Sequence, residues 1–191
     1  MRGWTLLFAA LTAVLSVALA LQVRENRRLS AELGALTAAQ ARAAGIEAGQ
    51  ALAPFSLHDA AHQEVRVDFA GGHAGTVLLF LASGCEACAS SIAHWRGAIE
   101  QAARPDVRVL CIQTDEAEGG PLAPEGLPAS LLVPLPPVGW LAALPAVPAT
   151  LVLDEGGVLV QVWYGELDAG IAQELARTIA GLSAPAGVPS R

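Results

Sequence analysis

An apolar run at residues 76–81 leads into a Cys-Glu-Ala-Cys motif at residues 85–88, and this junction limits the possible folds of the 191-residue chain more than any other part. A continuous apolar run bounded by glycines is typical of a strand buried on both faces. Residues 89–103 have the pattern of a helix that ends before Pro105. Residues 107–112 form a second apolar run. Strand, helix and strand in this order predict a βαβ unit with two parallel strands, whose helix begins at the cysteine motif.

The segments on either side of this unit extend the α/β pattern. Residues 54–57 and 65–69 predict a hairpin or an edge strand, because the second of them alternates apolar and polar side chains. Residues 150–164 predict two strands joined by an Asp-Glu-Gly-Gly turn. Asp168 has the position of an N-cap for a last helix. We therefore expect an α/β domain with a central mixed sheet flanked by helices over residues 49–182, followed by a disordered tail at residues 183–191.

The N-terminal part of the chain has a different character. Residues 3–23 carry no charge, and as a helix of about 1.5 Å per residue they would reach across a hydrocarbon core of roughly 30 Å. Residues 1–23 therefore predict a transmembrane anchor, or a signal peptide cleaved after Ala18-Leu19-Ala20. Residues 24–48 predict a helical stalk. Arginines on both sides of the apolar run leave its orientation open.

The charge of the chain limits the classes of partner. There is no lysine, and residues 49–191 carry six arginines and fifteen acidic residues. This acidic domain lacks the concentrated basic patch of a nucleic-acid binder, so we expect no nucleic-acid partner. Acidic charge around the cysteine motif favours basic partners.

The two cysteines of the motif predict a dithiol that can open and close. A cysteine at a helix N-terminus faces unpaired N–H groups and the positive end of the helix dipole, and both stabilise its thiolate. Cys88 shares a helix face with Ile92, Trp95 and Ile99, so it should face the core while Cys85 lies at the exposed tip. We therefore expect Cys85 to attack a partner's sulfur and Cys88 to resolve the mixed disulfide.

Other interpretations of the cysteines are open at this point. The pair could be half of a zinc site or two structural thiols, although a second Cys-x-x-Cys is missing from the sequence. We predict no metal site. Cys111 lies between apolar residues of a predicted strand, so we expect a buried packing thiol there.

The order of these features resembles the thioredoxin superfamily, and more narrowly its membrane-tethered TlpA/ResA/MauD-like members, over residues 49–181. The βαβ unit with Cys-x-x-Cys opening its helix is followed by Val147-Pro148-Ala149-Thr150, a strand hairpin and a final helix. The resemblance implies a thioredoxin-like fold. It also implies a cis-proline opposite the cysteine motif, and Pro148 is the matching position. The backbone of Val147 would then be free to pair with a substrate strand.

The sequence departs from the family's pattern around the motif. Ala82-Ser83-Gly84 stands where a tryptophan often precedes it, and Ala87 stands where many relatives carry proline. Glu86 places a negative charge beside Cys85. We expect Glu86 to tune the site by destabilising the Cys85 thiolate, which favours the disulfide and makes the pair more reducing than a DsbA-like oxidant. A solvated Glu86 with little effect is the alternative.

The resemblance implies an enzyme, a protein-disulfide oxidoreductase that acts more as a reductant than as an oxidant. It would need no cofactor besides the redox-active Cys85–Cys88 disulfide. Its setting would be the bacterial inner membrane, with a single span, a periplasmic domain and a membrane electron relay as reductant, for example in cytochrome c maturation. Peroxidase activity is disfavoured because Ala82 stands where peroxiredoxins need threonine or serine.

Two alternatives to this function remain. One is a Sco-like copper-binding chaperone, in which a histidine joins the two cysteines as a ligand; the candidates are His58, His62, His73 and His94. The other is a non-catalytic tethered binding module in which the cysteines form a permanent disulfide.

Overall fold

The computed structural model describes residues 15–29, 32, 36, 46–69, 72–115, 121–134, 136–137 and 139–183. The chain divides into two units, Met1–Ala39 and Gln40–Arg191. In the first unit, residues 15–29 are helical, and Leu15, Leu19 and Val23 are among its exposed apolar side chains. Within the described ranges, no helix is both long enough and apolar enough to cross a membrane. Most of the predicted anchor, much of the predicted stalk and nearly all of the predicted tail lie outside those ranges.

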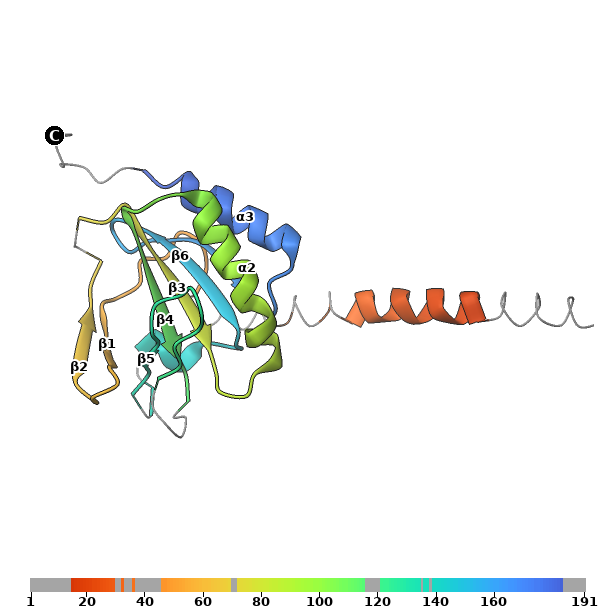
Figure 1. Ribbon diagram of the computed structural model, residues 1–191, viewed down its shortest axis with the longest axis horizontal. Coiled ribbons are helices and arrows are strands. Elements are labelled where there is room, and N and C mark those ends of the chain that lie inside the picture. Colours follow the sequence, from red (N-terminus) through yellow and green to blue (C-terminus); the bar gives the residue numbers. More distant parts are fainter. Residues whose placement is uncertain are drawn as a thin grey trace, which may run out of the picture. The chain divides into compact units, whose positions relative to one another are not determined.

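The described part of the second unit is built around a seven-stranded mixed sheet with the order β2-β1-β5-β4-β3-β6-β7 (Figure 1). Its strands are β1 (Phe55–His58), β2 (Glu64–Val67), β3 (Gly75–Leu81), β4 (Val107–Gln113), β5 (Leu131–Leu132), β6 (Ala149–Asp154) and β7 (Leu159–Tyr164). The helices are α2 (Glu86–Ala102) and α3 (Ala169–Ala180), with a 3₁₀ turn η1 (Gly139–Ala143). The predicted α/β fold with a mixed sheet is confirmed.

The central βαβ unit forms as the apolar runs predict. β3 and β4 pair in parallel, from Gly75 opposite Val107 to Leu81 opposite Gln113, and every residue of β3 is buried. α2 begins directly after Cys85 and ends at Ala102. The parallel pairing and the crossover helix bring the carboxyl ends of β3 and β4 to the same edge of the sheet, where the cysteine motif lies.

The predicted hairpins and the last helix are also present. β1 and β2 pair antiparallel, and so do β6 and β7. In the β6–β7 turn, Asp154 accepts hydrogen bonds from the N–H groups of Gly156 and Val158, both at 2.9 Å. α3 begins at its N-cap Asp168, whose carboxylate accepts the Ile171 N–H at 2.8 Å.

Two features differ from the sequence-based expectation. β5 is only two residues long and pairs with both β1 and β4. It lies within residues 119–148, whose many prolines and glycines predict one short helix or turn and little else. A pair of residues carries no periodicity, so its strand conformation depends on the neighbouring strands. The core also begins earlier than the expected domain start at residue 49, since Ile46 is only 1% exposed.

The sheet separates two apolar clusters. One face packs Phe55, Phe80 and Leu151 against η1 and its Trp140. The other face lies beneath α2 and α3, which run side by side across it (Figure 1), and its largest side chain is the fully buried Trp95. Trp95 donates its indole N–H to Thr150 Oγ1 on β6 at 2.8 Å. This contact fixes α2 on the sheet and therefore fixes the position of its N-terminus.

Candidate redox site

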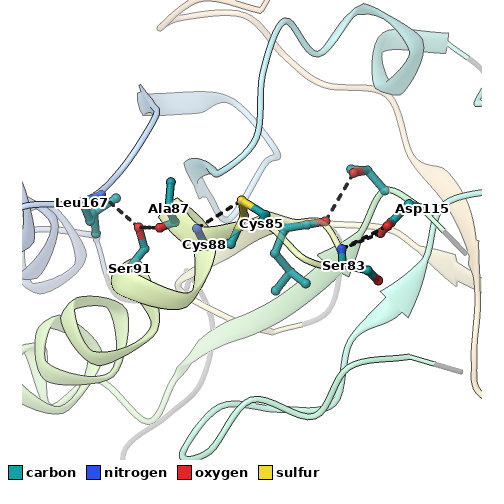
Figure 2. The surroundings of a disulfide bond; sticks show 9 residues. Ser83, Cys85, Ala87, Cys88, Ser91, Asp115 and Leu167 are labelled. Carbon is teal, nitrogen blue, oxygen red and sulfur yellow. Dashed lines mark hydrogen bonds between the residues drawn. A yellow bond between two sulfur atoms is a disulfide. The ribbon is translucent and has the colours of Figure 1, made fainter. Parts of the chain in front are cut away.

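Cys85 and Cys88 are joined by a disulfide at the N-terminus of α2, with their Cα atoms 5.2 Å apart (Figure 2). Cys85 is the N-cap, and its Sγ accepts the Cys88 N–H at 3.1 Å. Cys88 is only 4% exposed, whereas Cys85 is half-buried. Cys85 is therefore the more accessible of the two residues, and its sulfur lies where the helix dipole and a main-chain N–H stabilise negative charge.

The loop that carries Cys85 is fixed by the end of β4. Ser83 donates its N–H to both carboxylate oxygens of Asp115, at 2.9 and 3.0 Å (Figure 2). Thr114 donates its N–H to the Leu81 carbonyl at 3.0 Å. Gly84 has a φ of 65°, a left-handed conformation that glycine adopts without strain. The chain can thus turn sharply between β3 and α2 and present Cys85 in one orientation.

Gln113 connects this loop to a second segment. Its side chain is 0% exposed. The amide nitrogen donates to Ser83 Oγ at 3.2 Å and to the Asp115 carbonyl at 2.8 Å, and the amide oxygen accepts the Leu122 N–H at 2.8 Å. Gln113 and Asp115 are not identified from the sequence, although a polar residue at the end of an apolar strand is a usable signal.

Ser91 fixes the other side of the motif. Its buried hydroxyl donates to the Ala87 carbonyl at 2.7 Å and accepts the Leu167 N–H at 3.0 Å (Figure 2). One side chain therefore joins the first turn of α2 to the segment that precedes α3. Residue patterns do not indicate this role, because a serine within a helix usually faces solvent.

The Val147–Pro148 peptide bond is cis, as the resemblance implies. Ala149, the first residue of β6, pairs with Phe80 one residue before the end of β3, and Pro148 directly precedes Ala149. Pro148 accepts the Gly165 N–H at 2.8 Å. Within the described ranges, no hydrogen bond joins the main chain of Val147 to another group.

An apolar pocket of about 330 Å³ adjoins the disulfide. Its wall includes Cys85, Cys88 and the exposed Glu86, which the motif places in the first turn of α2. A second pocket, of about 270 Å³, is lined by Val147 together with Leu141 and other residues of its loop. The structure thus brings Glu86 and both cysteines together around one pocket and places Val147 at the other.

Cys111 is the remaining cysteine, and it is fully buried in β4 as a free thiol. Burial raises its pKa to about 12. The prediction of a packing thiol is confirmed, since a neutral thiol is a poor nucleophile.

The four histidines lie on separate parts of the second unit. His58 ends β1, His62 and His73 lie in loops, and His94 lies on α2. Within the residues that the structure describes, no three histidine, cysteine or acidic side chains form a group that could hold a metal ion.

Comparisons with known proteins add the following. No protein-family model matches the chain, and neither does any curated protein. Among solved structures, a protein described as the thiol:disulfide interchange protein DsbE from Chlorobium tepidum is 17% identical with a TM-score of 0.55, and the match covers 70% of this chain and 95% of that one. The thioredoxin domain of a thiol-disulfide oxidoreductase from Bacteroides vulgatus is 14% identical with a TM-score of 0.54, covering 71% and 99%. A thiol:disulfide interchange protein from a Bacteroides species is 16% identical with a TM-score of 0.52, covering 70% and 88%. At these identities the comparisons show a common fold.

Proposed function

We propose that this chain, whose fold is thioredoxin-like, is a protein thiol–disulfide oxidoreductase that exchanges its Cys85–Cys88 disulfide with cysteines of partner proteins. The observation that carries the proposal is the placement of the disulfide. Cys85 is half-buried and caps α2, whereas Cys88 is buried in the core beneath the helix. A permanent structural disulfide has no need of this asymmetry.

In the reducing direction, the dithiol form reacts in two steps. The Cys85 thiolate attacks one sulfur of the partner's disulfide, so that a bond forms to Cys85 Sγ and the partner's other sulfur leaves as a thiolate and takes up a proton. Cys88 then gives up its proton and attacks Cys85 Sγ. This second step closes the Cys85–Cys88 disulfide and releases the partner's second thiol. Two electrons have passed to the partner, and the oxidising direction is the reverse.

We attribute the preference for the reducing direction to the negative charge of Glu86. Its exposed carboxylate follows Cys85 directly, in the first turn of α2. A negative charge there opposes the helix dipole and destabilises the Cys85 thiolate relative to the disulfide. The exchange itself needs no dissociable cofactor. Val147 and Pro148 form the wall along which the partner's main chain docks, since the Val147 backbone is unpaired in the described part of the chain.

We also propose where the chain acts. The uncharged residues 3–23 attach it to a bacterial inner membrane by a single span, and the domain faces the periplasm, where disulfides form and persist. A membrane electron relay restores the dithiol. Cytochrome c maturation is one process that needs such a periplasmic reductant.

The experiment that tests the function is a redox titration of the full chain in detergent, against glutathione and dithiothreitol. We expect a reversible two-electron couple near or below roughly −220 mV, with Cys85→Ser abolishing it. A couple near roughly −120 mV would reverse the direction of electron flow and contradict the role given to Glu86. If no reversible couple exists, the exchange function is wrong, and a non-catalytic module is the better description.

A further inference from the structure

The apolar pocket beside the disulfide is lined in part by residues that have no role in the exchange reaction. Besides the two cysteines, it includes Leu81, Ile92, Leu122 and Pro124. Leu122 and Pro124 belong to residues 121–130, which we call the crossover segment because they lie between β4 and β5 in the sequence. Cys85 is itself part of the wall. A partner cysteine that bonds to Cys85 therefore brings its neighbouring residues to the mouth of this pocket.

We propose that this pocket receives a large apolar side chain adjacent to the reacting cysteine of the partner, and that Leu122 determines this preference. The inference rests on the proposed function, whose partner it specifies. Transfer of an apolar side chain from water into an apolar pocket is favourable in proportion to the area buried. At about 330 Å³, the pocket lies at the lower end of the range for ligand sites, which suits a side chain better than a folded element.

The negative charge around the pocket limits which residues can lie beside the partner's cysteine. Glu86 is the one charged side chain among the described residues of the wall. Glu125, which follows Pro124 in the crossover segment, is also exposed. Acidic residues beside the partner's cysteine would be repelled, so the occupant is a neutral or basic segment with an apolar residue next to its cysteine.

The position of Leu122 is fixed by hydrogen bonds of its main chain. Its side chain can therefore be substituted without losing these bonds. Its N–H donates to the buried amide of Gln113 at 2.8 Å, and its carbonyl accepts the Ser130 N–H at 2.7 Å. The side chain is half-buried and packs against the cluster beneath α2. The pocket is therefore formed before a partner arrives, which lowers the entropy cost of binding.

The test measures the reaction of the reduced full chain with two blocked peptides. Each carries one cysteine in a disulfide with 2-thiopyridine, flanked by leucine in one peptide and by serine in the other. Cys85 attacks the peptide sulfur and displaces 2-thiopyridone, whose absorbance gives the rate, and Cys88 then displaces the peptide thiol. We expect the leucine peptide to react about tenfold faster, the discrimination typical of one apolar side chain in a pocket.

Two substitutions at Leu122 sharpen the test. Leu122→Ala enlarges the pocket and should reduce the preference to about twofold or threefold. Leu122→Trp fills the pocket and should slow the leucine peptide to the rate of the serine peptide. The matched control is Leu127→Ala, because Leu127 is a half-buried leucine of the same segment and cluster that does not line the pocket. This control should keep the tenfold ratio, and the comparison of the two peptides on the native chain remains decisive if a variant fails to fold.

The outcomes separate the inference from the proposed function. Equal rates for the two peptides with the native chain would overturn the inference. The exchange function would still stand if both peptides react faster with the chain than with free glutathione. Loss of the preference in Leu127→Ala as well as in Leu122→Ala would also overturn it. If neither peptide reacts faster with the reduced chain than it does with free glutathione, the exchange function fails, and the inference fails with it.

Discussion

Gln113 makes three side-chain hydrogen bonds although its side chain is fully buried, and one of them reaches the crossover segment. Gln113→Leu would leave the Leu122 N–H without its partner inside the protein. A buried polar group left unsatisfied costs about 1–3 kcal/mol. Because the Leu122 N–H is partly buried, we expect the free energy of unfolding to fall by an amount within this range. Urea denaturation measures the loss. The control is Gln101→Leu on the exposed face of α2, which should stay within about 0.5 kcal/mol of the native chain.

Two other residues give the stability a pH dependence in the alkaline range. Burial raises the pKa of both Cys111 and Tyr164 to about 12. Because the fold favours their neutral forms, this stabilisation is complete below the pKa values of the unfolded chain, about 8.5 for cysteine and about 10 for tyrosine. It is lost as the pH rises towards about 12. We expect the free energy of unfolding to fall over this range, and Cys111→Ala and Tyr164→Phe each to flatten the fall. An unchanged slope in both variants would contradict these assignments.

At the scale of secondary-structure elements, Ser91 links α2 to the segment that precedes α3. Ser91→Ala would leave the buried Leu167 N–H unpaired, so we expect a loss of about 1–3 kcal/mol in the free energy of unfolding. Ser90 is the matched control because it occupies the same helical turn but is exposed. Ser90→Ala should change the stability by less than about 0.5 kcal/mol. Similar losses in the two variants would show that the hydrogen bond between Ser91 and Leu167 contributes nothing to the stability.

The elements that the sequence predicted are those whose signal is local. The apolar run of β3, the turn at Asp154 and the N-cap Asp168 each carry their pattern within a few residues. The difference in burial between Cys85 and Cys88 also followed from helical spacing. The cis conformation at Pro148 was predicted from the family resemblance, because residue patterns alone do not distinguish it from a trans proline.

The elements that the sequence did not predict depend on contacts between distant segments. β5 is a strand only because β1 and β4 flank it, and two leucines carry no period of their own. The role of Asp115 requires that Ser83, on another strand's loop, lie within hydrogen-bonding distance. The pocket wall likewise requires the crossover segment to meet α2. Only the folded arrangement shows these contacts.

At the scale of the whole molecule, the folded core includes residues that lie far before the cysteine motif in the sequence. Ile46 is 1% exposed and belongs to the core cluster on the face opposite α2, and Gly49 donates its N–H to Leu159 at 2.7 Å. Ile46→Ala should lower the free energy of unfolding by about 2–5 kcal/mol, as expected when a large side chain in the core is replaced by a small one. Leu36→Ala is the control, because Leu36 is 68% exposed in the first unit. Thermal and urea unfolding of the full-length variants provide the comparison.

The hydrogen bond between Gln113 and the crossover segment has a consequence for how such a protein diversifies. Gln113 binds the main-chain N–H of Leu122, a donor that every amino acid except proline supplies. Mutation can therefore replace the side chain at this position while the backbone contact and the cysteine loop stay as they are. Under the proposed function, duplicated copies of the gene would inherit one cysteine site and acquire different partner proteins through changes at a single codon.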